Sequence, residues 1–295
     1  MSRLFDVDVG YRALREGAVV VAEAHDLVWV EGPDAVAFLQ GLVSQDVEAI
    51  PVGSVARSFL LGPQGKLVAL LWLARGDRRV GVVTDPGSGP VVAETLNRYR
   101  IRVRVEITEE RRPRFEVWGG GVETVGWVDS GSPVVGLPLG GIGRELRVGR
   151  PPGGLARVPA EVALAVRVEE GEPRMGHDVD ERTIPQETGL TPEAVSFTKG
   201  CYLGQELVAR IDSRGHVNRH LRGVVVDGRQ VPEESAELRA GERVVGHLTS
   251  PVASPRLGAP IGLALVRREV APGDRVVVRW AGAEAVAEIR ELPIR

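Results

Sequence analysis

The residues best suited to chemistry lie close together in the second half of the chain. Cys201 is the only cysteine, and Lys199, two positions before it, is one of two lysines among 37 basic residues. In a chain whose positive charge is almost entirely arginine, a lysine indicates a need for a compact ammonium that a planar guanidinium does not replace. A thiol beside an ammonium is favoured as the thiolate, which attacks electrophiles and binds metals. The pair therefore predicts a reactive thiolate at Cys201.

The neighbours of Cys201 indicate how the chain presents this thiol. Gly200 and Gly204 bracket it, and a polar Gln-Glu pair follows at once. Two glycines before such a pair are typical of a turn that leads into a helix, and free amides at a helix start favour a nearby thiolate. We therefore expect a turn at Cys201 and a helix over 206–212. The alternative is a small thiol buried in the core.

Length and composition indicate an ordinary globular protein of two or three domains. The chain has 295 residues, 43% of them hydrophobic, and its net charge of -3 gives no global reason to expect binding to nucleic acid or membranes. A single cysteine forms no internal disulfide and does not supply a structural zinc or iron-sulfur site, which needs about four ligands. No stretch reaches the roughly 20 apolar residues of a membrane span, and the acidic start is unlike a signal peptide. We expect a soluble, cytoplasmic protein without a stably bound metal.

Two polar segments leave other functions open. The segment between 170 and 187 is acidic, and His177, Asp178 and Asp180 are possible metal ligands but are more typical of side chains that cap turns. A basic run after the thiol stretch is consistent with either an RNA-binding surface or a solvated arginine-rich face. It comprises Arg210, Arg214, His216, Arg219, His220 and Arg222.

Residues 23–107 have the pattern of one compact unit. Apolar strand-like segments alternate with two helical ones, and Gly62-Pro-Gln-Gly65 is typical of a hairpin turn. The order strand, helix, hairpin and further strand, helix, strand predicts a ferredoxin-like α+β module with an antiparallel sheet. The expected strands are 25–31, 58–61, 67–73, 80–84 and 102–107, and the expected helices are 35–42 and 91–99.

The remaining residues form two further predicted units, and the fold class is α+β. Residues 1–22 and 108–220 together make a discontinuous central domain, with helices at 8–15 and 159–169 and short strands at 115–118 and 122–128. From residue 221 to the end, short apolar runs alternate with turn signals, which predicts a small β-barrel. Its expected strands are 221–226, 242–248, 262–267, 274–280 and 284–289.

Eight contiguous residues, Lys199-Gly-Cys-Tyr-Leu-Gly-Gln-Glu206, resemble the signature of the YgfZ family. These are folate-binding proteins related to the T protein (aminomethyltransferase) of the glycine cleavage system. The resemblance implies a T-protein-like fold, in which the ferredoxin-like module and the C-terminal barrel flank a central domain around a ligand cavity. Further similarity covers nearly the whole chain, in Gly32-Pro-Asp-Ala, Phe38-Leu-Gln-Gly, Asp46-Val, Leu61-Gly-Pro-Gln-Gly-Lys66, Gly171-Glu-Pro, Ile184-Pro-Gln-Glu187 and Thr249-Ser-Pro-Val-Ala-Ser-Pro255.

What the resemblance implies is a protein that binds tetrahydrofolate or a related folate and supports the assembly or repair of iron-sulfur enzymes. Cys201 would be the reacting group, as nucleophile or transient ligand, and iron-sulfur client or assembly proteins would be its partners. Lys199 would activate the thiol, and the supporting residues would be Gly200, Tyr202, Gly204, Gln205 and Glu206. Folate carboxylates favour arginine. The candidate folate contacts are Arg98, Arg100, Glu187 and Arg210.

Two departures from the T protein bear on catalysis. The T protein places an acidic pair in the hairpin where this chain has Lys66-Leu-Val-Ala-Leu70, and its Gly-Tyr-Thr-Gly-Glu segment has no counterpart near 136–147. Without those carboxylates, an aminomethyl transfer that needs acid groups near the folate amines loses its apparent chemistry. The leading hypothesis is therefore a folate-dependent accessory factor. A folate-dependent one-carbon transferase and a regulatory or RNA-related binding module are the alternatives.

Overall fold

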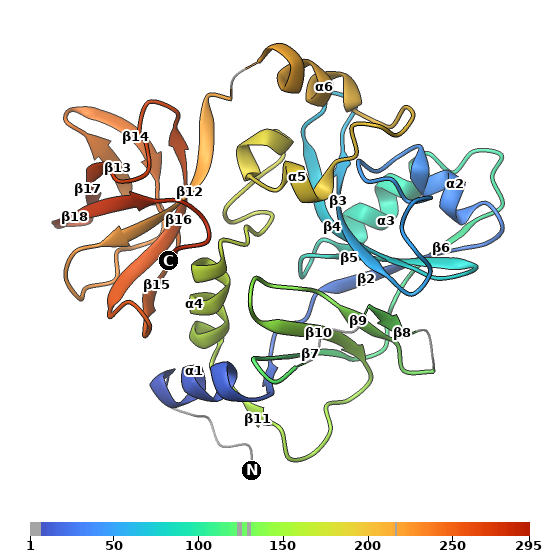
Figure 1. Cartoon of the computed structure of the whole chain (residues 1–295), viewed down its shortest axis with the longest axis horizontal. Helices are drawn as coiled ribbons and strands as arrows, with labels where there is room; N and C mark the ends of the chain where they lie inside the picture. The colour runs from blue at the N-terminus through green and yellow to red at the C-terminus, as the bar shows by residue number, and fades with distance from the viewer. Residues whose placement is uncertain (1–6, 123–125, 129–130, 216) are drawn as a thin grey trace.

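The computed structural model describes residues 7–122, 126–128, 131–215 and 217–295. Within these residues the chain folds into three β-sheets of five, six and seven strands, and Figure 1 shows them grouped around the helix α4 (Ala160–Glu170). The five-stranded sheet lies to the right in that view, the seven-stranded sheet to the left and the six-stranded sheet below. The mixture of helices and mainly antiparallel sheets confirms the α+β class.

The five-stranded sheet is antiparallel, with the order β3-β4-β5-β2-β6. Val28 and Val30 of β2 pack with the two helices on one face, whereas Leu27 and Trp29 pack against the six-stranded sheet on the other. Burial of both faces explains why this strand is apolar without interruption. The arrangement confirms the ferredoxin-like module. Its elements are β2 (Asp26–Glu31), α2 (Ala35–Gln40), β3 (Val55–Leu61), β4 (Leu67–Arg75), β5 (Arg79–Thr84), α3 (Gly89–Arg98) and β6 (Glu106–Glu109).

The six-stranded sheet has the order β11-β1-β7-β10-β9-β8, in which β1 and β11 are parallel and the other pairs antiparallel. Helices α1 and α4 pack against it, because Leu14 of α1 and Val162 and Val166 of α4 share a core with Trp118 of β7. Besides α4, its elements are α1 (Val7–Glu16), β1 (Val19–Val21), β7 (Arg114–Gly119), β8 (Trp127–Val128), β9 (Val134–Gly136), β10 (Gly143–Val148) and β11 (Ala156–Arg157).

The seven-stranded sheet is antiparallel, with the order β14-β13-β17-β18-β12-β16-β15. It curls around a core of its own, to which Val224, Val245, Val266 and Val278 all contribute from different strands. This confirms the predicted C-terminal barrel in the form of a half-barrel. Its strands are β12 (Arg219–Val226), β13 (Glu237–Ala240), β14 (Arg243–His247), β15 (Thr249–Ser254), β16 (Ala259–Arg267), β17 (Arg275–Trp280) and β18 (Ala283–Arg290).

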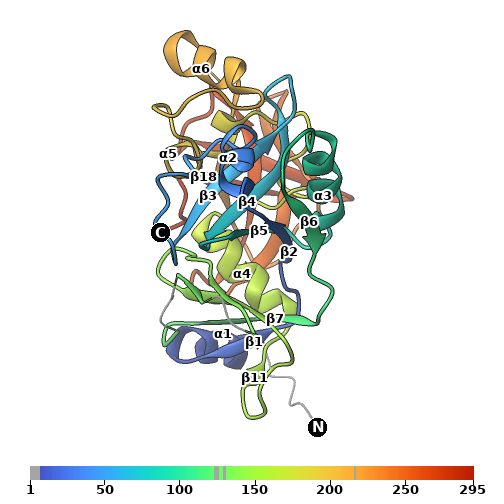
Figure 2. The same ribbon diagram turned by 90° about the vertical axis from the view of Figure 1, so that its right-hand side faces the viewer.

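A connecting segment leads from α4 to the seven-stranded sheet and contains short helices. It comprises the 3-10 turn η1 (Pro185–Thr188), α5 (Thr191–Ala194) and α6 (Gln205–Arg214). Figures 1 and 2 both show α6 at one end of the molecule, beyond β3 and β4, and α1 at the opposite end. The stretch around Cys201 therefore lies beside the five-stranded sheet.

Several predicted strands differ from those observed. The predicted strand 102–107 was placed too early, because Arg102 has a positive φ of 56° and the strand begins at Glu106. Six observed strands were not among those predicted, namely β1, β9, β10, β11, β13 and β15. Of these, β13 is short and polar and β15 contains Pro251. The predicted strand 122–128 is observed at its end, and residues 123–125 lie outside the described part of the chain. The division into 1–22 with 108–220, 23–107 and 221–295 stays a prediction.

Candidate functional site

The stretch that contains Cys201 is the turn before α6, as the glycines predicted. Gly204 precedes the helix with φ 77°, in the left-handed region that favours glycine. A Cβ atom on Gly204 would lie 2.5 Å from the carbonyl oxygen of Gly62, in the turn between β3 and β4. Glycine is therefore needed for the hairpin turn and the start of α6 to pack together.

Lys199 ties this turn to the end of α2. Its Nζ atom lies 2.7 Å from the carbonyl oxygen of Gln40, 2.8 Å from that of Val43 and 2.9 Å from that of Gln45. An ammonium has three N–H donors, so each has an acceptor. All three donors are therefore engaged by backbone carbonyl groups, and none is left for a hydrogen bond to Cys201.

Partial burial shapes the chemistry of Lys199 and Tyr202. Burial lowers the pKa of Lys199 to about 8, against the opposing charges of Asp46 and Glu48. The centroid of the Tyr202 ring lies 5.2 Å from Nζ, within cation–π range. Burial also raises the pKa of Tyr202 to about 12, so its hydroxyl is protonated at neutral pH.

Cys201 is exposed, so the alternative of a buried thiol is wrong. The position that a Cβ would take on Gly200 has no neighbouring atom within 4 Å, which leaves the loop open on this side. Glu206 is exposed in the first turn of α6, and the Gln205 side chain accepts a hydrogen bond from the backbone of Tyr202. The thiol is thus exposed on a turn whose backbone is held by the Gln205 side chain.

A cavity of about 420 Å³ lies between β1, β7, α4 and the seven-stranded sheet. Its walls include Val21, Trp118, Leu164 and Pro251, and charged groups enter it at several points. The volume lies in the range of roughly 300–1,000 Å³ that is usual for ligand sites. Residues 196–206 do not line it.

His25, in the wall of this cavity, is held by Glu116 of β7. Glu116 Oε1 accepts a hydrogen bond from the backbone N–H of His25 and lies 2.6 Å from Nδ1, while Oε2 accepts from Trp118 at 2.7 Å. Burial opposes ionisation of Glu116, but the charge and hydrogen bonds of His25 and the charge of Arg144 lower its pKa to about 2. The carboxylate is therefore ionised, and Nδ1 of His25 carries a proton.

Glu172, just after α4, forms a second buried ion cluster beside His25. Arg144 donates to its Oε1 at 2.9 Å, and an Arg57 nitrogen lies 3.3 Å from its Oε2. Burial opposes ionisation, but the charges of both arginines outweigh it and lower the pKa of Glu172 to about 2. Two carboxylates and two guanidinium groups thus meet inside the protein.

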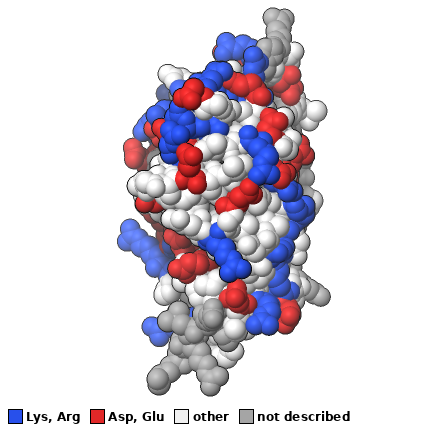
Figure 3. All heavy atoms as spheres, turned by 90° about the vertical axis from the view of Figure 1, so that its left-hand side faces the viewer, with Lys and Arg blue, Asp and Glu red and all other residues white. Residues whose placement is uncertain are grey.

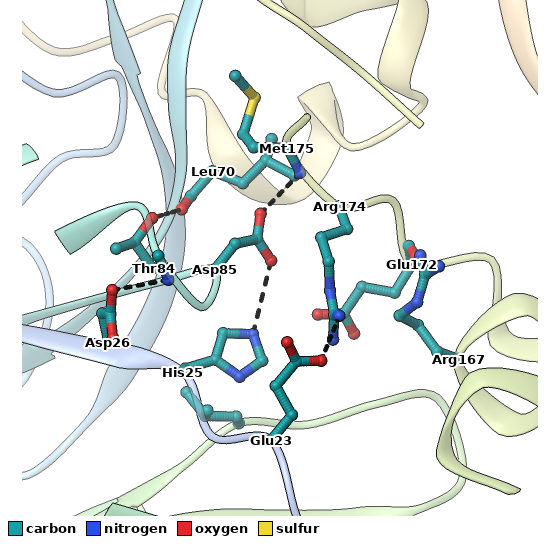
Figure 4. A network of polar contacts seen from close by, with 12 residues as sticks. Glu23, His25, Asp26, Leu70, Thr84, Asp85, Arg167, Glu172, Arg174 and Met175 are labelled. Carbon is teal, nitrogen blue, oxygen red and sulfur yellow. Dashed lines mark hydrogen bonds and ion pairs between the residues drawn. The ribbon is translucent and has the colours of Figure 1, made fainter. Parts of the chain in front are cut away.

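Asp85 follows β5 and faces His25, as Figure 4 shows. Its Oδ1 lies 3.8 Å from His25 Nε2, and its Oδ2 accepts a hydrogen bond from the backbone of Met175. Burial raises the pKa of Asp85, although the charges of His25 and Arg174 oppose this. Arg174 lines the cavity and pairs with Glu23 at 2.6 Å.

The sequence patterns did not single out this buried cluster. A signal was present, because Glu116 interrupts an apolar strand and Asp85 directly follows another. Charged residues inside apolar runs are rarely buried without a partner. Their partners, however, come from strands and helices far apart in the sequence, so the cluster becomes visible only in the fold.

The four residues predicted to contact folate do not line the cavity. Arg98 forms an exposed ion pair within α3, and Arg100 donates to a backbone carbonyl. Arg210 is exposed on α6, and Glu187 accepts hydrogen bonds from Arg219. In the described part of the chain, no hydrogen bond or ion pair joins these four residues to one another or to Cys201.

The basic run after Cys201 does not form a uniform positive surface. Glu187 neutralises Arg219 at 2.8 Å, and burial lowers the pKa of His220. His216 and the side chain of Arg214 lie outside the described part of the chain. Figure 3 shows acidic and basic side chains interspersed over the face that carries the seven-stranded sheet. The RNA-related alternative gains no support from this face.

The acidic segment between 170 and 187 uses its side chains to cap its own turns, as the sequence predicted. Asp178 accepts from the backbone of Arg174, and Asp180 accepts from the backbone of Arg182. In the described ranges, no three His, Cys, Asp or Glu side chains are grouped as they would be to hold a metal ion. In the same ranges, no helix combines the length and apolar character needed to cross a membrane.

An apolar cluster connects the thiol turn with the buried charges. Tyr202 packs against a cluster that contains Phe59 and Leu70. The same two residues line a narrow pocket together with His25 and Asp85. The two regions are therefore linked by packing rather than by direct contact.

Comparisons with known proteins point to one kind of relative. Residues 219–294 match the family model described as the glycine cleavage T-protein C-terminal barrel domain. The chain is 27% identical over 286 residues to an aminomethyltransferase of Thermotoga petrophila, in an alignment covering 97% of this chain and 60% of that protein. It is 33% identical over 147 residues to an aminomethyltransferase of Streptomyces avermitilis, covering 48% of this chain and 39% of the relative. The alignments thus span less than two thirds of either relative.

A solved structure shares the fold over the whole chain. The glycine cleavage system aminomethyltransferase T of Bartonella henselae superposes with a TM-score of 0.88, covering 100% of this chain and 91% of that one, at 19% identity. At this identity the likeness concerns the fold alone. The chain therefore has a T-protein-like fold, which ends in a sheet that matches the T-protein C-terminal barrel domain.

Proposed function

We propose that the chain binds tetrahydrofolate or a related folate and, like the YgfZ family, supports the assembly or repair of iron-sulfur enzymes through the thiol of Cys201. The observation that carries this proposal is the exposed thiol on a turn that Lys199 anchors through three carbonyl groups. A lone thiol suits a transient encounter with an electrophile or a cluster, because a stored cluster needs about four ligands. The partners would be iron-sulfur client or assembly proteins in the cytoplasm.

The residues around the cavity fit a folate. The flat pterin and the aromatic linker need apolar walls with a few polar groups, and Val21, Trp118 and Leu164 supply such walls. The glutamyl carboxylates need an arginine, and Arg174 lines the cavity while paired with the exposed carboxylate of Glu23. When bound, a reduced folate would supply or accept a one-carbon unit.

Arg174 is better placed than Arg167 to hold the folate tail. Arg167 is buried and already donates to Asp178, to Ser250 and to the carbonyl of Glu172. Breaking such a buried network is costly. Arg174 would only exchange one carboxylate for another. The contacts predicted from the sequence, at Arg98, Arg100, Glu187 and Arg210, stay predictions.

The test is the substitution Cys201→Ala in cells whose iron-sulfur enzymes depend on this chain. We expect the activity of those enzymes to fall to the level of cells that lack the chain, with melting temperature and folate affinity near wild type. Val231→Ala, which shortens an exposed side chain of the C-terminal sheet region, is the matched control and should keep full activity. Full activity in the Cys201→Ala cells would remove the thiol from the proposal.

A folate-dependent one-carbon transferase is the second candidate. It is favoured by the relatives named aminomethyltransferase and by the buried acid–base cluster at the cavity. Against it, the hairpin position that carries acids in the T protein holds Leu67, Ala69 and Leu70, which are buried and apolar. Turnover of a methylamine or aminomethyl donor in the presence of tetrahydrofolate would establish this activity, and its absence with bound folate would exclude it.

A further inference from the structure

His25 has one engaged ring nitrogen and one that lacks a hydrogen bond. Nδ1 lies 2.6 Å from the ionised carboxylate of Glu116, which keeps a proton on that nitrogen. Nε2 lies 3.8 Å from Oδ1 of Asp85, beyond hydrogen-bond distance, and no other described group donates to it or accepts from it. The His25 side chain is only 7% exposed, and it lines the cavity of about 420 Å³. Nε2 is therefore placed either to bind a ligand in the cavity or to move into hydrogen-bond distance of Asp85.

His25 lies between Asp85 and the cavity of about 420 Å³. It lines the narrow pocket that Asp85 also lines, and it lines the cavity of about 420 Å³. Among the described residues, no other one lines both spaces. A molecule in the cavity would therefore reach Asp85 through His25.

The buried charged groups around His25 and Asp85 have a net charge of zero when His25 and Asp85 themselves are not counted. Glu116 and Glu172 carry negative charge, and Arg57 and Arg144 carry the matching positive charge. One proton shared between His25 and Asp85 then leaves these buried groups neutral. Glu193, which also pairs with Arg57 at 3.1 Å, lies on the exposed surface. The other charged groups nearby are already paired, as Arg174 with Glu23, Arg114 with Asp26 and Arg167 with Asp178.

We propose that His25 and Asp85 form a proton-transfer pair that serves a basic nitrogen of the ligand in the cavity, an amine or a ring nitrogen. The proposal rests on the proposed folate binding for the identity of that ligand. At rest, one proton is shared between Nε2 of His25 and the carboxyl group of Asp85.

The transfer moves a single proton. When a ligand nitrogen with a free lone pair reaches Nε2, the Nε2–H bond breaks and an N–H bond forms on the ligand. His25 is left neutral, with Nδ1–H still donating to Glu116, and the new cation lies in the field of the Asp85 carboxylate. In the reverse direction the ligand returns the proton to Nε2. The total charge is unchanged, and no oxidant or reductant is needed.

The first experiment follows the imidazole nitrogen resonances of the five histidines through pH, with His25→Gln used to identify His25. In Asp85→Asn, we expect the imidazolium signal of His25 to vanish at a pH lower by about one unit or more, because an opposite charge is lost nearby. Asp77→Asn is the matched control, since Asp77 is an exposed carboxylate in the turn between β4 and β5. Its titration should equal that of wild type. Equal titrations in wild type and Asp85→Asn would overturn the pair.

The second experiment needs only the wild-type chain and tetrahydrofolate, so it does not depend on a variant that folds. At a pH where free His25 is an imidazolium, saturation with tetrahydrofolate should convert its spectrum to that of the neutral ring protonated on Nδ1. Binding without any change at His25 would overturn the inference and leave the proposed function standing. If the first experiment shows that His25 and Asp85 titrate together but tetrahydrofolate does not bind, the proposed function is overturned. The His25–Asp85 pair then stands, and folate is not its ligand.

Discussion

The Nζ atom of Lys199 lies 2.7 Å from the carbonyl oxygen of Gln40, the last residue of α2 and 159 positions earlier in the chain. Helix ends leave carbonyl groups without partners, and one ammonium here satisfies this carbonyl and two that follow it. The turn that presents Cys201 is therefore fixed to the amino-terminal module and does not depend on its own sequence alone.

Lys199→Met should destabilise the protein and loosen the thiol turn. Three carbonyl groups lose their donor, and we expect a loss of about 2 kcal/mol or more in the free energy of unfolding. Lys199→Arg should recover only part of it, because a planar guanidinium does not direct three donors from one atom. Lys66→Met, at the other lysine of the chain, is the control and should change stability little. Urea denaturation measures all three, and equal losses in Lys199→Met and Lys66→Met would refute the anchor.

Gly204→Ala should be destabilising, whereas Gly200→Ala should be tolerated. A Cβ on Gly204 meets a carbonyl oxygen at 2.5 Å in a backbone with φ 77°, whereas a Cβ on Gly200 meets open space. The strained backbone and the close contact together should cost about 1–3 kcal/mol or more. Thermal unfolding of the two variants tests this difference. Two variants of equal stability would show that the hairpin turn and α6 are not packed as described.

Acid should destabilise the fold through Glu116 and Glu172. Both have folded pKa values of about 2 against an ordinary value of 4.5. Between these values the unfolded chain binds more protons, so stabilisation that is complete above 4.5 is lost as the pH falls towards 2. Glu116→Gln should flatten this pH dependence, and Glu233→Gln, at an exposed site, should not. Urea denaturation between pH 2.5 and 6 gives the slope of the free energy of unfolding against pH for each variant. Equal slopes in the two variants would contradict the prediction.

Arg174→Met should weaken folate binding, and Arg98→Met should not. Loss of a charged hydrogen bond to the folate tail corresponds to about tenfold or more in the dissociation constant. Arg98 is the matched control because it lies on the exposed surface of α3, where it pairs with Glu94. Isothermal titration with a folate that carries several glutamyl groups makes the comparison. Weakening by Arg98→Met alone would favour the contacts predicted from the sequence over the cavity.

The features that the sequence predicted well are those with local causes. Gly204 before Gln205 marks the start of α6, and Gly62 and Gly65 mark the hairpin, because each turn depends on a few adjacent residues. The alternation of Leu27 and Val28 likewise reports two buried faces of one strand. Local signals of this kind gave the α+β class and most of the strands.

The features that the sequence did not predict depend on contacts between distant segments. His25, Asp85, Glu116 and Glu172 belong to four separate parts of the chain, and each alone is an ordinary polar residue beside an apolar run. The role of Lys199 was also incomplete, since its carbonyl partners on the α2 side cannot be inferred from its neighbours. Strand β15 was missed because Pro251 disfavours a strand except where the sheet edge leaves its nitrogen unpaired.

The proposed function requires the Cys201 thiol and a bound folate to act together on iron-sulfur enzymes. Because Cys201 is the only cysteine, iodoacetamide can block one defined thiol on the purified wild-type chain. The direct measurement is the recovery of activity of an inactivated iron-sulfur enzyme that depends on this chain, with unmodified or alkylated protein and with or without tetrahydrofolate. We predict recovery only with the unmodified chain and folate together, and equal recovery with the alkylated chain would contradict the account.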